Sequence, residues 1–370
     1  MLSMKSKNRQ RFLFVQLGEQ FPEYLIQNLK WVEDVFKEFE IAVVVDNAKN
    51  QEFVESLGFE GFLYQRSRTV DTLINTTKHD KHFREGFWHF TIDRLFAICE
   101  YVICKSNVNI IYIESDVLLL PNFPATELFA DNVISWTRYN HLRDVPSLIH
   151  IAEQSSAEFL RTALTRIFEK YPGSTDMSAL RLVEEEFAEE VMLLPTMVKG
   201  FENEHLVSRD EFQKCSRIAN TEGVKFNGIF DGAVIGMYLT GQDPRNSYGL
   251  VRFLNSQLLN RDESYVDLNE VKFRMKGTRL FMMKESKSEV EIYNLHIHSK
   301  DIALFSTKAL SHLHKLVIHS KKNKEYHRFK FFIFVDLVLV NIKQRTFIRF
   351  TVGFFRYLWR LISSRFMGRI

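Results

Sequence analysis

The sequence predicts an α/β protein: an open, mostly parallel twisted sheet with flanking helices, followed by a basic amphipathic helical extension at the C-terminus. Short apolar runs alternate with longer segments of helical periodicity, which is the βαβα rhythm of a sheet covered on both faces. One apolar run ends in two carboxylates. The last 50 residues hold 12 lysines and arginines but 2 acidic residues, whereas the rest holds 37 and 44, so the basic end is physically distinct.

The first half of the chain supplies most of the predicted sheet. Each strand is a short run rich in apolar residues, and three of the four end at a glycine or an acidic residue. Each helix places its apolar residues three or four positions apart. We expect strands over 11–17, 41–45, 110–113 and 133–136, and helices over 22–36, 51–57 and 87–104.

The second half has a different pattern. Residues 145–198 are expected to be mostly helical, with one helix over 156–171 and a second that Thr175 caps. Residues 197–226 are polar and irregular. Residues 291–298 alternate between apolar and polar side chains, which predicts one more strand.

Two carboxylates follow the apolar run Ile110–Ile113. Glu114 and Asp116 are two positions apart, so in extended backbone they point to the same side. They lie at the carboxyl end of a strand, where open α/β sheets bind ligands. Paired carboxylates suit Mg²⁺ or Mn²⁺, and such an ion can hold a phosphorylated substrate. The alternative is that these residues only cap a loop or a helix.

The segment 230–246 is rich in glycine and begins with Asp231. Small residues there would let the backbone approach a ligand closely. Asp231 is the best candidate for a catalytic residue near the reacting carbon, as general base or acceptor-orienting group. The alternative is that Asp231 caps the start of a helix.

Two histidines and a lysine follow on the late predicted strand. His296 and His298 share one face of that strand, and imidazole binds Mn²⁺ readily beside oxygen ligands. Lys300 then offers a point charge for phosphate. The alternative is a solvated strand face without a ligand.

In this order the motifs resemble those of the GT-A glycosyltransferases, which bind nucleotide-sugars on an α/β sheet with a D-x-D-type acidic motif at a strand end. The match covers roughly residues 11–305. It consists of strands ending at Gly18 and Asp46, a helix opening F-W-x-x-T-x-x-R-L that contains Arg94, the acidic motif, F-D-G-A-x-x-G-x-Y-L, and H-x-H-S-K. Bacterial enzymes that build surface polysaccharides are the most similar members.

The resemblance implies roles for residues of this chain. Asp116, Glu114 and His298, or His296 in its place, would hold Mn²⁺ or Mg²⁺. The nucleotide-sugar would contact five residues: Gly18, Asp46, Arg94, Glu114 and Lys300. The chain departs from the family pattern, because its acidic motif is E-S-D and its late motif is H-S-K. The donor sugar and the stereochemical outcome are therefore left open.

The C-terminal extension carries a basic stripe. At 100° per residue, four arginines of the segment 345–362 fall within about 60° of arc, with aromatic and leucine side chains opposite. This pattern is typical of a helix lying on an anionic membrane surface. Packing on the protein's own core and a dimer contact are the alternatives. No fold or stacking motif for nucleic acid is present. The four arginines are Arg345, Arg349, Arg356 and Arg360.

Together these features predict a metal-dependent glycosyltransferase that moves a sugar from a nucleotide diphosphate donor to a saccharide acceptor, expected to be lipid-linked. We expect a catalytic domain over 1–306, with a nucleotide-sugar half at about 11–140 and an acceptor half at 141–306, and a membrane-associating region over 307–370. Three cysteines without a pairing pattern, and no signal or spanning segment, predict a cytoplasmic protein on the inner face of the cell membrane. The alternatives are a sugar nucleotidyltransferase and a catalytically silent membrane scaffold.

Overall fold

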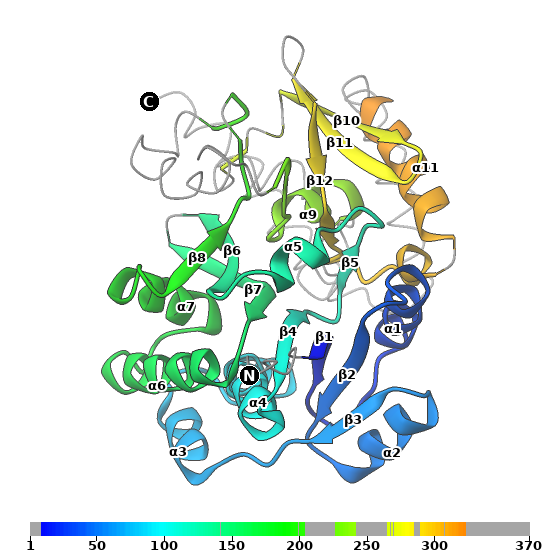
Figure 1. The fold of residues 1–370 in the computed structure, drawn as a ribbon. Coiled ribbons are helices and arrows are strands. Elements are labelled where there is room, and N and C mark those ends of the chain that lie inside the picture. The colour runs from blue at the N-terminus through cyan, green and yellow to red at the C-terminus, as the bar shows by residue number, and fades with distance from the viewer. Residues whose placement is uncertain are drawn as a thin grey trace, which may run out of the picture.

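A computed structural model describes residues 9–140, 142–198, 200–203, 226–241, 265, 266, 268, 270–284, 289–306 and 308–322 (Figure 1). Its centre is a seven-stranded sheet in the order β3-β2-β1-β4-β7-β6-β8. The strands run parallel except for β7, which is antiparallel to both of its neighbours. The predicted mostly parallel α/β sheet is therefore confirmed. The strands are β1 Arg9–Gln16, β2 Glu40–Val45, β3 Glu60–Leu63, β4 Val108–Ile113, β6 Ile134–Asn140, β7 Arg143–Ile151 and β8 Val191–Leu194.

Helices cover both faces of this sheet, as two adjacent residues of β1 show. Arg11 points to one face, where its Nη1 donates to the Tyr101 hydroxyl of α4 at 2.6 Å. Phe12 points to the other face, where its ring contacts Phe36 after α1 and Phe129 of α5. The helices of this part are α1 Glu23–Val35, α2 Ala48–Ser56, α3 Arg68–Thr76, α4 Phe87–Lys105, α5 Ala125–Phe129, α6 Gln154–Lys170 and α7 Asp176–Glu186, with the 3₁₀ turn η1 at Phe83–Glu85.

The late part of the chain forms a second, four-stranded sheet in the order β10-β11-β12-β9. From β12 the chain continues into β13, which pairs antiparallel with β5, the short strand that follows β4. This pairing joins the late part to the carboxyl end of the central sheet (Figure 1). The elements are β5 Val117–Leu119, β9 Gly228–Ile229, α9 Val234–Thr240, β10 Val271–Lys276, β11 Arg279–Lys284, β12 Val290–Ile292, β13 Asn294–His296, η3 Ile302–Phe305 and α11 Ala309–Lys322.

The second half of the chain departs from the sequence prediction. Residues 145–198 hold the two predicted helices, α6 and α7, but they also hold two strands that were not predicted, the end of β7 and all of β8. The physical reason is that these strands are buried and carry mainly apolar runs without strict alternation, which periodicity does not distinguish from a buried helix. The single strand expected over 291–298 is two short strands, β12 and β13. Thr175 caps α7 as predicted, because its hydroxyl accepts from the Ser178 amide at 3.2 Å.

The predicted C-terminal stripe lies outside the described residues, because these end at Lys322. The last described helix, α11, buries Ala309, Leu313 and Val317 and contacts β10, η3 and α9. Within the described part of the chain, no helix combines the length and apolar character needed to cross a membrane. The division of the chain at residue 306 and the membrane-binding role of the C-terminal segment stay predictions.

Candidate metal and nucleotide-sugar site

The predicted carboxylates stand at the carboxyl end of β4, where the chain makes a tight turn before β5. The Val117 amide donates to the Glu114 carbonyl at 2.9 Å, and the turn places both carboxylates at one point. Asp116 is 4% exposed, while Glu114 is half-buried. Helix α1 fixes this turn, because the Asn28 side-chain amide donates to the Val117 carbonyl at 2.9 Å.

His296 joins the carboxylates from the late part of the chain. In the pairing of β13 with β5 it stands opposite Val117, which is the next residue after Asp116. Its Nε2 lies 3.2 Å from Oδ1 of Asp116 and 3.5 Å from Oε2 of Glu114. Each of the three side chains offers one ligand atom, and these atoms lie within 4.8 Å of one another. An oxygen, oxygen and nitrogen donor set of this size fits a divalent cation.

The ring of His296 is oriented for this role. Its Nδ1 lies 2.8 Å from the Gly232 carbonyl, which only accepts, so Nδ1 carries a proton and Nε2 faces the carboxylates. Burial alone would lower the pKa of His296, but the charges of Asp116 and Glu114 outweigh burial and raise this pKa to about 9. A cation that binds here therefore replaces a proton on Nε2.

Lys300 lies on the other side of Asp116. Its Nζ donates to Oδ2 of Asp116 at 2.9 Å and lies 5.3 Å from the centre of the Tyr24 ring. Its backbone is left-handed, with φ at 52°, in a turn that ends with its amide donating to the Ile297 carbonyl. Burial would raise the pKa of Asp116, but Lys300 and His296 hold it well below its usual range.

His298 is close to the site but is not one of the three clustered ligands. Its ring stacks on that of His296 with the ring centres 4.1 Å apart. The strand pairing ends at His296, and the chain then turns toward Lys300, so the two histidines do not reach the same point. A ligand role for His298 stays a prediction, and the geometry favours His296.

Arg94 reaches the site from α4. Its Nη1 donates to Oε1 of Glu114 at 2.5 Å, and its Nη2 donates to Oδ2 of Asp176 at 3.1 Å. The guanidinium thus positions Glu114, while its predicted contact with phosphate stays untested. Sequence reasoning missed Asp176, although the cap at Thr175 placed it in the first turn of α7. The partners of Arg94 in space left no sequence signal.

Asp231 caps α9, which is the structural alternative raised from the sequence. Its Oδ1 accepts from the Ile235 amide at 2.9 Å, and its Oδ2 accepts from the amides of Gly236 at 2.7 Å and His296 at 3.0 Å. Burial raises the pKa of Asp231, against the effect of these amides. A role as general base stays a prediction. The geometry favours a positioning role, because both carboxylate oxygens already accept hydrogen bonds from backbone amides.

The glycines of this segment bring two backbones together. A Cβ at Gly236 would lie 2.0 Å from the His296 carbonyl oxygen, so only glycine lets α9 approach β13 this closely. The expected close approach is therefore real, but at Gly236 it is made to a strand of the protein itself.

Gly18 and Asp46 meet just after the ends of β1 and β2, and their predicted contact with the nucleotide-sugar stays a prediction. The Gly18 amide donates to Oδ2 of Asp46 at 2.9 Å, and φ of Gly18 is 93°, which favours glycine. The ring of Phe90 lies 3.4 Å from where a Cβ of Gly18 would stand. Arg94 follows Phe90 by one turn of α4, so this helix runs between the Gly18 end and the carboxylates.

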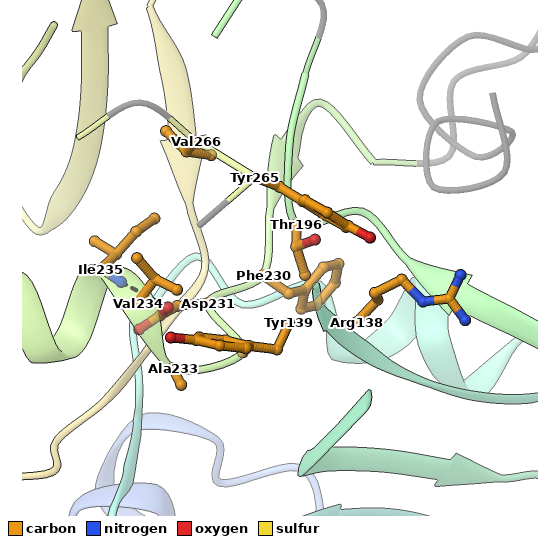
Figure 2. A pocket seen from close by; sticks show the side chains of 11 residues that line it. Arg138, Tyr139, Thr196, Phe230, Asp231, Ala233, Val234, Ile235, Tyr265 and Val266 are labelled. Atoms are coloured by element: carbon orange, nitrogen blue, oxygen red, sulfur yellow. Dashed lines mark hydrogen bonds between the residues drawn. The ribbon is translucent and has the colours of Figure 1, made fainter. Parts of the chain in front are cut away.

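A pocket adjoins the histidine side of the site (Figure 2). Its cavity volume is about 20 Å³, which is room for little more than one water molecule. Its residues come from four separate segments, and the sequence marked only one of them, the glycine-rich segment that begins at Phe230. Its walls are Arg138, Tyr139, Thr196, Phe230, Asp231, Gly232, Ala233, Val234, Ile235, Tyr265 and Val266.

Among the solved structures that are similar to this chain are several glycosyltransferases. The galactosyltransferase LgtC, in complex with donor and acceptor sugar analogs, is 13% identical, with a TM-score of 0.37 over 50% of this chain and 73% of that one. The PaToxG glycosyltransferase is 9% identical, with a TM-score of 0.32 over 57% and 84%. The bifunctional WbbM is 12% identical, with a TM-score of 0.33 over 51% and 39%. No protein-family model matches the chain, and no curated protein sequence does either. We therefore argue for a function from the site itself.

Proposed function

We propose that this protein is a metal-dependent glycosyltransferase that moves a sugar from a nucleotide diphosphate donor to a saccharide acceptor. One observation carries the proposal: Glu114, Asp116 and His296 converge within 4.8 Å, with the Lys300 ammonium beside them. Three such ligands suit a divalent cation, and the nearby lysine adds a positive charge where a diphosphate would meet that cation.

The donor set favours Mn²⁺ over Mg²⁺, because imidazole is a better ligand for Mn²⁺ than for the oxygen-seeking Mg²⁺. The three residues that would hold the ion are Asp116, Glu114 and His296. When bound, it would supply Lewis acidity to the leaving diphosphate. The Gly232 carbonyl fixes the His296 tautomer, and Arg94 fixes the rotamer of Glu114.

In the proposed reaction the bond between the anomeric carbon and the diphosphate oxygen breaks, and its electron pair leaves with the diphosphate. A new bond forms from the anomeric carbon to an acceptor hydroxyl oxygen, and the hydroxyl proton is released to solvent water. Lys300 stabilises the charge that develops on the diphosphate. Gly18 and Asp46 border the nucleoside, at the carboxyl ends of β1 and β2.

We also propose that the acceptor is lipid-linked and that the segment 345–362 holds the protein on the inner face of the cell membrane. Each basic residue near an anionic surface contributes about 1 kcal/mol, and added salt screens this term. Sedimentation with vesicles tests the proposal. The intact protein should bind vesicles that contain anionic lipid and release at high salt. Equal binding to neutral vesicles would contradict it.

Thermal stabilisation tests the catalytic proposal. UDP, GDP, CDP and dTDP are added to the protein with and without Mn²⁺, because a ligand that binds only the folded state at 100 times its Kd stabilises by about 2.7 kcal/mol. We expect one nucleotide to raise the Tm only when Mn²⁺ is present. Asp116→Asn should lose this effect. Asp34→Asn, an exposed position on α1, is the matched control and should keep it. The absence of any Mn²⁺-dependent nucleotide effect would overturn the proposal.

A further inference from the structure

A buried acidic residue lies behind the three clustered ligands. Asp176 stands in the first turn of α7, is 4% exposed, and reaches the metal site through Arg94 of α4. Its Oδ2 accepts from Nη2 of Arg94 at 3.1 Å, across 82 positions of sequence. Nη1 of the same guanidinium donates to Oε1 of Glu114 at 2.5 Å. One cationic side chain therefore joins a carboxylate of the metal site to a carboxylate outside it.

Helix α7 does not depend on Asp176 for its cap. The Thr175 hydroxyl accepts from the Ser178 amide at 3.2 Å, and the Ser178 hydroxyl accepts from the Thr175 amide at 2.8 Å, which is a complete capping box. The N-terminus of a helix favours negative charge in its first turn, where Asp176 stands. The helix therefore holds this carboxylate in place and stabilises its charge.

Two carboxylates orient the Arg94 guanidinium. Its third nitrogen, Nε, is buried and has no hydrogen-bond partner within the described part of the chain, so the hydrogen bonds to Glu114 and Asp176 fix its position. Burial raises the pKa of Asp176, and Arg94 opposes that shift, while Asp176 in turn raises the pKa of Arg94. Each member of this pair thus stabilises the charged form of the other.

The balance of charge shows what this pair does for a cation. Five charged side chains meet here, three acidic and two basic, and their charges sum to −1: Glu114, Asp116, Asp176, Arg94 and Lys300. The excess negative charge attracts a cation. Without the charge of Asp176 the sum would be zero, and Glu114 would be the acidic partner that Arg94 retains. A cation would then compete with the whole charge of Arg94 for the Glu114 carboxylate.

We infer that Asp176 is a positioning residue of the metal site: it holds the Arg94 guanidinium and shares its charge, so that Glu114 stays negative enough to bind a divalent cation. The inference rests on the proposed function and adds to it a residue that acts on the cation through Arg94.

Calorimetric titration of Mn²⁺ into the full-length protein, without nucleotide, tests the inference. Asp176→Asn keeps the shape of the side chain and removes its charge, so we expect Mn²⁺ to bind about 10-fold more weakly. Asp176→Ser gives the same comparison if the asparagine variant does not fold, and thermal unfolding of each variant establishes that it is folded.

A double-mutant cycle separates an effect through Arg94 from an independent one. Arg94→Met removes the guanidinium, so no charge is left for Asp176 to share. In that background, Asp176→Asn should change the Mn²⁺ affinity by less than about twofold. Equal losses in the two backgrounds would mean that Asp176 does not act through Arg94, and would overturn the inference.

Thr175→Ala is the matched control for a structural effect of α7. It removes the capping hydroxyl and should lower the Tm, but the pair of Asp176 and Arg94 remains, so Mn²⁺ affinity should stay within about twofold of the wild type. A loss as large as that of Asp176→Asn would mean that the stability of α7 controls the metal site, and would overturn the inference.

Unchanged Mn²⁺ affinity of Asp176→Asn would overturn the inference and leave the proposed function standing. Failure of the proposed function gives a different result, in which the wild type binds Mn²⁺ but no nucleotide diphosphate with it. A wild type that binds no Mn²⁺ would overturn both.

Discussion

The two sides of the candidate metal site are built differently. Glu114 and Asp116 belong to one continuous piece of chain, the end of a buried strand, and their spacing alone places them together. His296 comes from 180 positions further on and arrives through the antiparallel pairing of β13 with β5. The first side is local in sequence, whereas the second depends on tertiary structure.

This difference explains why the register of β13 decides the chemistry. Leu295 and His296 stand opposite Leu118 and Val117, so His296 is the last paired residue and faces the carboxylates. A slip by one residue would turn an apolar side chain toward the site. Two contacts hold β13 in this register. The carboxylate of Asp231 accepts from the His296 amide, and Gly236 lets α9 pack closely against the His296 backbone.

Asp116→Asn breaks the local side and should have the largest effect. The amide keeps the shape of the carboxylate but removes the charge that a hard cation needs. We expect a loss of at least about 1000-fold in turnover, or about 4 kcal/mol of transition-state stabilisation. Steady-state kinetics with saturating Mn²⁺ and the nucleotide-sugar identified by the screen measure it.

Glu114→Gln is the matched comparison for this prediction. Glu114 is less buried and shares its charge with Arg94, so the loss should be smaller. Near-normal turnover by Asp116→Asn would mean that Asp116 does not bind the metal.

Gly236→Ala breaks the tertiary side. The added methyl would stand 2.0 Å from the His296 carbonyl oxygen, so α9 and β13 must separate. Overpacking of this severity against backbone should cost about 3 kcal/mol or more of folding free energy. Thermal unfolding and Mn²⁺ titration measure the two consequences.

Gly232→Ala is the control for that prediction, because its methyl would meet its nearest neighbour at an ordinary 3.5 Å. Its Tm should stay close to that of the wild type. Equal Tm values for Gly236→Ala and wild type would mean that α9 does not hold β13 in place.

Features that depend on a single stretch of sequence were predicted better than features that depend on contacts between distant stretches. Strands β1, β2 and β4 and helices α1 and α4 were found from periodicity, because each is an unbroken apolar pattern. The hairpin of β10 and β11 was not found, and β7 and β8 were missed within a segment that was expected to be mostly helical. For the site, the carboxylates and a late histidine were predicted. The family resemblance favoured His298, whereas His296 is the histidine that clusters with the carboxylates. Alternation places both histidines on one face, and only the end of the strand pairing separates them.

His296→Ala and His298→Ala sharpen the comparison at that position. His296 lies 3.2 Å from Asp116 and His298 is outside the cluster, so His296→Ala should weaken Mn²⁺ binding more. We expect about 10-fold to 100-fold for His296→Ala, and less than threefold for His298→Ala through the lost ring stacking. Calorimetric titration of Mn²⁺ measures both. The reverse order would restore His298 as the ligand implied by the family resemblance.

Asp231→Asn should have the smallest effect and separates the two interpretations of Asp231. If Asp231 positions β13, the amide group of asparagine faces three backbone amides that it cannot all satisfy, and the folding free energy should fall by about 1–2 kcal/mol. Mn²⁺ affinity should fall with it, because the His296 amide loses its acceptor. If Asp231 is instead the general base, kcat falls at least 100-fold while the Tm and Mn²⁺ affinity stay unchanged. We expect the first pattern, since both carboxylate oxygens already accept from backbone.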